Sequence, residues 1–150
     1  TPSHTSYYVT AINIFKDYKF FGAGPKSFKK NCKIKKYAAV EVRFGEGGNE
    51  YAFSCATHPH NYYIQLLSET GLIGVTFLIF GYLSLFFLLL KIILSKENDD
   101  NLYNYYIVLI GGLLINFFPF MPTGNFFNNW LSIIIYMPIA FILKSLNDTK

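Results

Sequence analysis

The feature that most constrains this chain is an apolar run from Leu72 to Leu94, which carries no charge before Lys91. A helix of that length rises about 35 Å, and the hydrocarbon core of a bilayer is about 30 Å thick. The run therefore predicts a membrane-spanning helix. Of all residues, 52% are hydrophobic and only 15% are charged. This composition favours a membrane protein over a soluble domain.

Two more apolar stretches follow, at Tyr103–Phe118 and Trp130–Leu146. Tyrosines begin the first stretch and a tryptophan begins the second, as is typical of helices whose ends lie at the membrane interface. Gly111 and Gly112 would allow close packing of helices. We predict an all-α integral membrane protein with about three transmembrane helices, and Pro119–Asn129 as a tight loop between the last two.

The N-terminal half of the chain alternates between apolar and polar stretches. Residues 1–21 show apolar recurrence interrupted by polar residues, which favours a helix lying in the membrane interface rather than crossing it. Gly22–Pro25 then predicts a turn. Lys26–Ser54 is expected to be a large exposed loop, in which Tyr37–Val42 reads as a short strand or an extended arm.

Most of the positive charge precedes residue 57. The basic residues there are Lys16, Lys19, Lys26, Lys29, Lys30, Lys33, Lys35, Lys36 and Arg43. Nucleic-acid binding is disfavoured, because the cluster is tethered to membrane segments. Attraction to lipid phosphates or to an anionic diphosphate substrate fits better, and a solvated basic loop is the alternative.

Residues 57–74 bring two histidines, an amide and a carboxylate together beside the first span. Thr57 or His58 is expected to cap a helix with Pro59 at its first position, and Gly71 to end it. His60 would then lie in the first turn, where the helix dipole favours its neutral, proton-accepting form. The alternative is a structural histidine. Polar residues recur along the helix at Asn61, Gln65, Ser68 and Glu69.

Cys32 and Cys55 bracket the basic loop. A disulfide between them would require an oxidising compartment such as the periplasm. A zinc site built from both cysteines with His58 and His60 is a second interpretation, although no Cys-x-x-Cys pair is present. Two unlinked thiols are the third.

Three stretches together resemble one known family. They are His60-Asn61 followed by Gly71 and Gly74, the upstream Phe21-Gly22-Ala23-Gly24-Pro25, and the downstream segment 118–127. In this order they resemble the O-antigen ligase and polymerase family, bacterial membrane glycosyltransferases that act on undecaprenyl-diphosphate-linked glycans. The likeness runs from about Tyr8 to about Trp130.

The resemblance implies a GT-C-like membrane fold of which this chain is the C-terminal part. Residues 1–71 would supply an interfacial helix and a catalytic periplasmic loop, and residues 72–150 the transmembrane region of the same domain. The multi-pass protein would lie in the bacterial inner membrane, among its lipids. Lysines near the far ends of the spans favour the cytoplasm there only weakly, so the cysteines and the resemblance carry the periplasmic assignment.

The implied reaction moves a glycan from undecaprenyl diphosphate to a hydroxyl of lipid A-core or of another lipid-linked glycan. Such chemistry needs a base near the hydroxyl and positive charge near the diphosphate. His60 would be the base or would position the acceptor. Glu69 would assist it, with His58 and Asn61 orienting it or binding sugar hydroxyls. No cofactor is expected, because the sequence has neither a nucleotide motif nor a clear metal motif.

Positive charge for the diphosphate would come from Arg43, the only arginine, and from nearby lysines. His4 is included as a substrate-binding residue because it falls where many relatives carry a phosphate-contacting arginine. Because this chain has a histidine at that position, the phosphate-binding role of the arginine cannot be transferred to it. Two other functions stay open: a non-catalytic membrane subunit, and a metal-dependent membrane hydrolase that uses His58 and His60.

Overall fold

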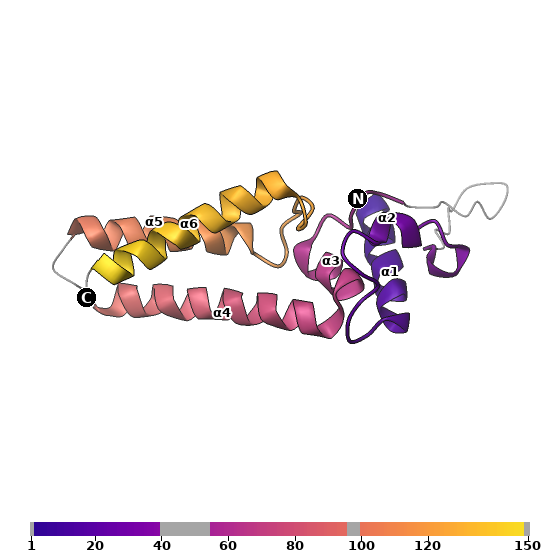
Figure 1. The fold of residues 1–150 in the computed structure, drawn as a ribbon, viewed down its shortest axis with the longest axis horizontal. Helices are drawn as coiled ribbons and strands as arrows, with labels where there is room; N and C mark the ends of the chain where they lie inside the picture. The colour runs from indigo at the N-terminus through magenta and orange to yellow at the C-terminus, as the bar shows by residue number, and fades with distance from the viewer. Residues whose placement is uncertain (1, 40–54, 96–99, 149–150) are drawn as a thin grey trace.

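The computed structural model describes residues 2–39, 55–95 and 100–148, and the regular elements in these ranges are all helical. Two groups of helices form the molecule (Figure 1). The N-terminal group contains α1 (Pro2–Asp17), α2 (Phe28–Asn31), the 3-10 helix η1 (Lys35–Tyr37) and α3 (Tyr62–Glu69). The three-helix bundle contains α4 (Gly71–Ser95), α5 (Asp100–Asn116) and α6 (Asn129–Asp148). The predicted all-α class is confirmed.

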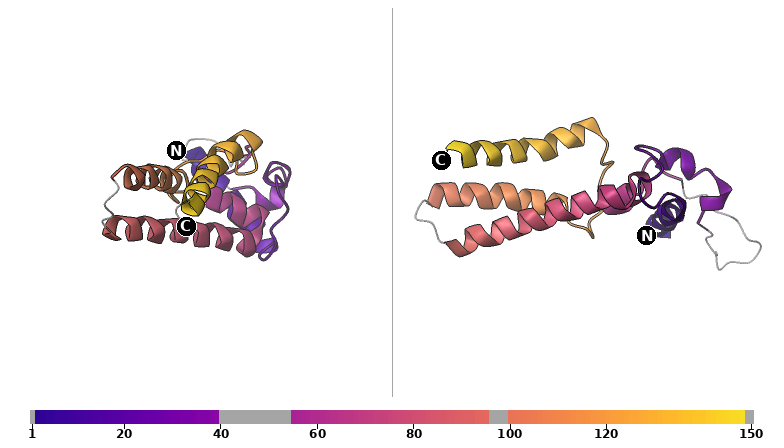
Figure 2. Two further views of the ribbon diagram at one scale, coloured as in Figure 1. Left: turned by 60° about the vertical axis from the view of Figure 1, so that its left-hand side comes forward. Right: turned by 60° about the horizontal axis from the view of Figure 1, so that its bottom comes forward.

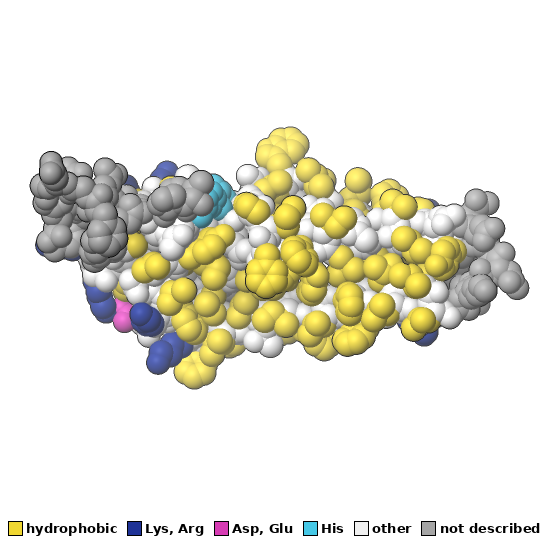
Figure 3. Space-filling model, turned by 180° about the vertical axis from the view of Figure 1, so that it is seen from behind, with side chains coloured by type: hydrophobic (Ala, Val, Ile, Leu, Met, Phe, Trp, Pro, Cys, Tyr) yellow, Lys and Arg dark blue, Asp and Glu magenta, His cyan; other side chains and the backbone are white. Residues whose placement is uncertain are grey.

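The three helices of the bundle lie side by side, with the N-terminal group at one end (Figure 2). Among the described helices, α4 is long and apolar enough to cross a membrane, over Gly71–Leu94. The apolar parts of α5 and α6, Tyr103–Asn116 and Asn129–Lys144, are shorter. Both helices form where the sequence predicted them, while their crossing of the membrane stays a prediction. Apolar side chains cover one long face of the bundle in Figure 3.

The core of the bundle is built from bulky side chains. Ile110 and Leu113 of α5 are almost completely buried and pack with Ile135 and Ile142 of α6. The expected close packing at Gly111 and Gly112 is wrong, because a Cβ on either would have no neighbour within 4 Å. Leucine, isoleucine and aromatic side chains bury more apolar area than a glycine contact could, so they form this interface.

The N-terminal group has a small core of its own. Ala11 and Ile14 of α1 pack against Phe28, Cys32 and Tyr37. The first helix ends at Asp17, four residues earlier than predicted, and a turn follows it. The predicted strand at Tyr37–Val42 is not formed over residues 37–39, where η1 ends, and residues 40–42 lie outside the described ranges.

The turn after α1 joins the two groups. Gly22 and Gly71 both have φ of +69°, and a Cβ on Gly22 would collide with the backbone of Glu69 and Thr70. Leu72 N donates to Lys19 O at 2.8 Å, and Gly24 N donates to Glu69 O at 2.9 Å. The predicted glycine turn therefore covers the junction of α3 and α4, where helix-end groups need partners.

Candidate functional site

The histidine segment, residues 57–61, precedes α3 rather than forming its first turn. Asn61 is the N-cap, and its Oδ1 accepts hydrogen bonds from Tyr63 N at 3.0 Å and Ile64 N at 3.1 Å. The predicted cap at Thr57 or His58 is therefore wrong. Asparagine is among the strongest N-cap residues, and in the extended conformation its side chain reaches the second and third helical N–H groups.

His60 occupies an uncommon backbone conformation. Its φ is +61°, in the left-handed region, where a non-glycine residue is rare. The chain turns there between Pro59 and the cap residue Asn61. Strained conformations of this kind concentrate at functional sites. The conformation therefore agrees with a functional role for His60.

Three histidine rings meet in this region. The centroid of the His60 ring lies 4.2 Å from that of His58 and 5.4 Å from that of His4 on α1. The ring of Tyr7, also on α1, lies 5.7 Å from His60. The structure thus brings His4, His58 and His60 together, from segments more than fifty residues apart. Histidine side chains reach the surface at the edge of the N-terminal group (Figure 3).

Both histidines of the segment are biased toward the neutral form. Burial, and then the nearby charge of His4, lower the pKa of His60 below its ordinary value. The pKa of His58 is lowered by burial and then by the charge of His60, against an opposing effect of the Thr123 backbone. The sequence predicted a neutral His60 but attributed it to the helix dipole. Burial and a neighbouring histidine are the causes in the structure.

His58 is the most enclosed of the three rings. Its Nδ1 lies 2.9 Å from Thr57 Oγ1, while its buried Nε2 has no hydrogen-bond partner of good geometry among the described residues. Thr123 Oγ1 is buried and unpartnered in the same way. A buried polar atom without a partner is costly. Thr123 Oγ1 therefore retains hydrogen-bonding capacity, while the His58 ring is held against the Thr123 backbone.

The loop between α5 and α6 packs on the histidine segment. Thr123 N donates to His60 O at 2.9 Å, and Asn61 Nδ2 donates to Pro119 O at 2.7 Å. The sequence predicted a loop here that faces the same side as His60, and the two are in direct contact. Thr123 was missed as a site residue, although it lies in the downstream stretch that carries the family resemblance.

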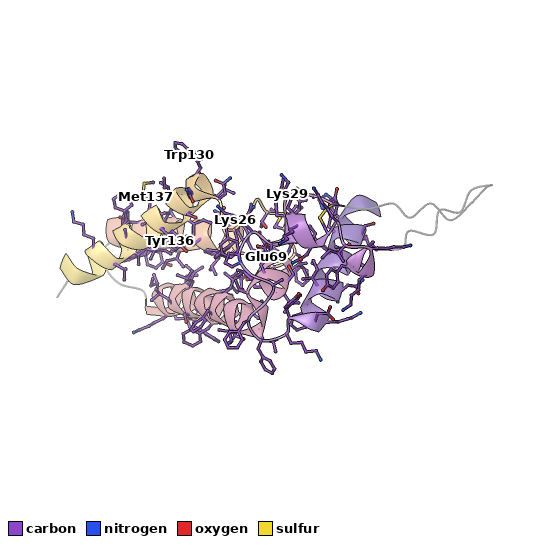
Figure 4. The ribbon with its side chains drawn as sticks, turned by 45° about the vertical axis from the view of Figure 1, so that its right-hand side comes forward. Lys26, Lys29, Glu69, Trp130, Tyr136 and Met137 are labelled. Carbon is purple, nitrogen blue, oxygen red and sulfur yellow. A yellow bond between two sulfur atoms is a disulfide. The ribbon has the colours of Figure 1, made fainter. Side chains whose placement is uncertain are left out.

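Glu69 is not brought to His60. It ends α3, whereas His60 precedes the first residue, and an eight-residue helix rises about 12 Å. Its Oε1 accepts from Phe28 N at 2.8 Å, and its Oε2 accepts from Gln65 Nε2 at 2.9 Å. Glu69 is 1% exposed and lies where the N-terminal group meets the bundle (Figure 4). These contacts make it a structural link rather than a partner of the base.

Gln65 extends this link to the loop. Its Nε2 also donates to Asn125 Oδ1, and its Oε1 accepts from Phe126 N, both at 2.9 Å. The sequence indicated Gln65 only as one of the polar residues that recur along the helix, and did not predict its contacts with the loop. Gln65 and Glu69 can be buried because their polar atoms are hydrogen bonded to Phe28 on one side and to the loop between α5 and α6 on the other. These hydrogen bonds hold α3 between the two segments.

Of the remaining predicted residues, Arg43 lies outside the described ranges. Cys32 and Cys55 are joined in a disulfide with their Cα atoms 5.3 Å apart. Bonded to each other, these sulfurs are not available as zinc ligands. Among the described residues, no group of three or more histidine, cysteine, aspartate or glutamate side chains is arranged to hold a metal ion.

One of the comparisons with known proteins identifies a family. A family model described as O-Antigen ligase matches residues 3–79, which include α1, the histidine segment, α3 and the start of α4. This is about half of the chain. The comparison with curated proteins gives no match, and neither does the comparison with solved structures.

Proposed function

Because this chain belongs to the O-antigen ligase family, we propose that it transfers a glycan from undecaprenyl diphosphate to an acceptor hydroxyl on lipid A-core or on another lipid-linked glycan. The observation that carries the proposal is the ring cluster around His60. It combines an imidazole of lowered pKa, a strained backbone and two further histidines, in a chain whose α4 is long enough to span the membrane.

His60 acts as the general base in this proposal. The acceptor oxygen bonds to the anomeric carbon of the donor while His60 takes the hydroxyl proton. The bond from that carbon to the diphosphate oxygen breaks, and the diphosphate leaves with the electron pair. A base with a lowered pKa is already unprotonated at neutral pH, so it can accept a proton without first losing one.

The residues around His60 position the substrates. His58, whose ring lies 4.2 Å from that of His60, and Thr123, which is hydrogen bonded to the His60 carbonyl, are assigned to sugar or phosphate oxygens. His4 lies within ring contact of His60 and adds positive charge when protonated. Asn61 fixes the segment rather than touching substrate, since its oxygen and its amide nitrogen are both engaged. Arg43 remains our candidate for the leaving diphosphate.

The family is found in the bacterial inner membrane, and we place the histidine segment on its periplasmic side. The disulfide between Cys32 and Cys55 supports this orientation, because such bonds persist in oxidising compartments. Cys55 lies two residues before the histidine segment. The bond and the site therefore face the same compartment.

The test is His60→Ala in a transfer assay with purified protein, lipid-linked donor and acceptor. We expect transfer to be lost, with unchanged membrane insertion and unchanged elution on size exclusion. Lys144→Ala serves as the control, since Lys144 is exposed near the end of α6 and has no assigned role in the reaction. Retained transfer in His60→Ala would remove this residue from the mechanism.

A further inference from the structure

Two hollows on the bundle meet at one residue. The larger has a volume of about 570 Å³ and lies between α4 and α6. Its walls are almost entirely apolar and include Leu78 and Leu85 of α4 and Ile139 of α6. Its volume is in the range of pockets that enclose small organic ligands. Phe127 lines both this groove and the second hollow.

The second hollow is polar and has a volume of about 340 Å³. It is lined by Lys26 together with Asn125, Asn128, Asn129 and Trp130. Figure 4 shows Lys26 between the bundle and the N-terminal group, on the side where Trp130 lies in the first turn of α6. The apolar groove and the polar hollow, which carries a cation, are therefore neighbours that share the Phe127 side chain as a wall.

The polar hollow presents hydrogen-bond donors. Asn125 Oδ1 accepts from Gln65 Nε2 and Phe127 N, and Asn128 Oδ1 accepts from Trp130 N. The side-chain oxygens are therefore engaged, and the amide N–H groups remain for a ligand. No carboxylate lines either hollow. The chemistry that complements this surface is an anion attached to a hydrocarbon chain.

We propose that the two hollows form a binding site for an anionic membrane phospholipid. One acyl chain lies in the groove between α4 and α6, and the phosphate lies at Lys26 within reach of the asparagine amides. A packed protein helix would fill the groove but would leave the cationic hollow unused. The adjacency of an apolar and a cationic hollow on the two sides of Phe127 therefore favours a lipid as the occupant.

The bound lipid would also support the histidine segment. Asn125 and Phe126 are hydrogen bonded to Gln65, and Thr123 of the same loop is bonded to His60. A lipid that packs on Phe127 restrains this loop from its outer side. The binding itself does not depend on the transfer reaction, so it is testable in a protein that transfers nothing.

The experiment measures retained lipid by native mass spectrometry after exchange into phosphatidylglycerol or phosphatidylcholine. Lys26→Gln should lower phosphatidylglycerol retention about fivefold, the effect expected of one lysine at an anionic lipid surface, and leave phosphatidylcholine unchanged. Gly81→Leu should lower retention of both lipids, because Gly81 lines the groove and a Cβ there meets nothing within 4 Å. Lys144→Gln and Gly111→Leu, which change residues that line neither hollow, are the controls, and they should leave retention unchanged.

Three results would overturn the proposal. The first is equal retention in Lys26→Gln and the unaltered protein. The second is displacement of phosphatidylglycerol by stoichiometric polyprenyl phosphate, which would assign the groove to the donor's lipid instead. The third is a change of oligomeric state in Gly81→Leu without loss of lipid, which would assign the groove to a second copy of the chain.

Discussion

Asn61 and Pro119 are joined by a 2.7 Å hydrogen bond from the Asn61 amide to the Pro119 carbonyl, across 58 residues of sequence. The other end of the same side chain caps α3. One asparagine therefore sets where the helix begins and where the loop between α5 and α6 lies against it. His60 is the residue immediately before this asparagine.

Replacing Asn61 by aspartate tests the contact with the loop separately from the capping of α3. Aspartate also caps helices, so Asn61→Asp keeps the cap but sets a carboxylate against the carbonyls of Pro119 and Met121. We expect a loss of about 1–3 kcal/mol in stability and a marked loss of transfer. Thermal unfolding and the transfer assay measure both, with Ser84→Ala as a control for loss of an exposed hydrogen bond. Wild-type transfer in Asn61→Asp would show that the loop contact is dispensable.

The pH dependence of transfer should reveal the base. The pKa of His60 lies below its ordinary value of 6.5, so the rate should be level at neutral pH and fall only below it. His4→Gln removes one of the two causes of the lowered pKa. The pKa of His60 then rises toward 6.5, and the acid limb of the kcat profile moves to higher pH. An unmoved acid limb would mean that another group takes the proton.

Glu69 is expected to stabilise the fold without taking part in the reaction. Glu69→Gln weakens its bonds to Phe28 N and Gln65, and should lower stability by about 1–3 kcal/mol. Transfer per folded molecule should change by less than roughly threefold. The measurement is the transfer rate normalised to the folded fraction. A hundredfold loss per folded molecule would restore the catalytic role predicted from the sequence.

The disulfide should control both stability and activity. It closes a separation of 23 residues and fixes the chain shortly before His58, so its loss is expected to cost about 3 kcal/mol. Cys32→Ala, Cys55→Ala and the double variant should behave alike, since each removes the same bond. Reduction of the native protein should lower transfer to the same level, and added reductant should not affect the variants further. Unchanged activity after complete reduction would contradict this role.

Gly22 and Gly24 provide a matched pair at the turn after α1. Both have positive φ, but a Cβ on Gly22 would strike the backbone of Glu69, whereas one on Gly24 meets nothing within 4 Å. Gly24→Ala should therefore cost only the conformational strain, about 1–3 kcal/mol. Gly22→Ala should yield little folded protein, as measured by size exclusion of the detergent extract. Equal yields would show that the turn can move away from α3.

The sequence predicted the helices better than the site. Apolar runs mark α4, α5 and α6 because a membrane or a helical core demands long apolar segments, whatever their partners. The start of α3 was placed too early because several residues near Pro59 can cap a helix, and only the contact with Pro119 selects Asn61. Glu69 was predicted to assist His60 because both belong to one polar segment of the sequence. In the structure the two residues lie at opposite ends of α3. His4 was predicted to bind substrate because of its place in the family pattern, whereas its ring contact with His60 depends on how α1 packs.

The junction at Gly22 and Gly71 has a mechanical consequence. The first turn of α4 is hydrogen bonded to Lys19 and Phe20, and the end of α3 to Ala23 and Gly24. The angle between the long helix and the N-terminal group is therefore fixed. A bilayer that changes thickness alters the tilt of a helix spanning it. Any such tilting of α4 would move the three histidine rings relative to the lipid headgroups. Membrane thickness would then set the distance between the bilayer surface and the point where an acceptor meets His60.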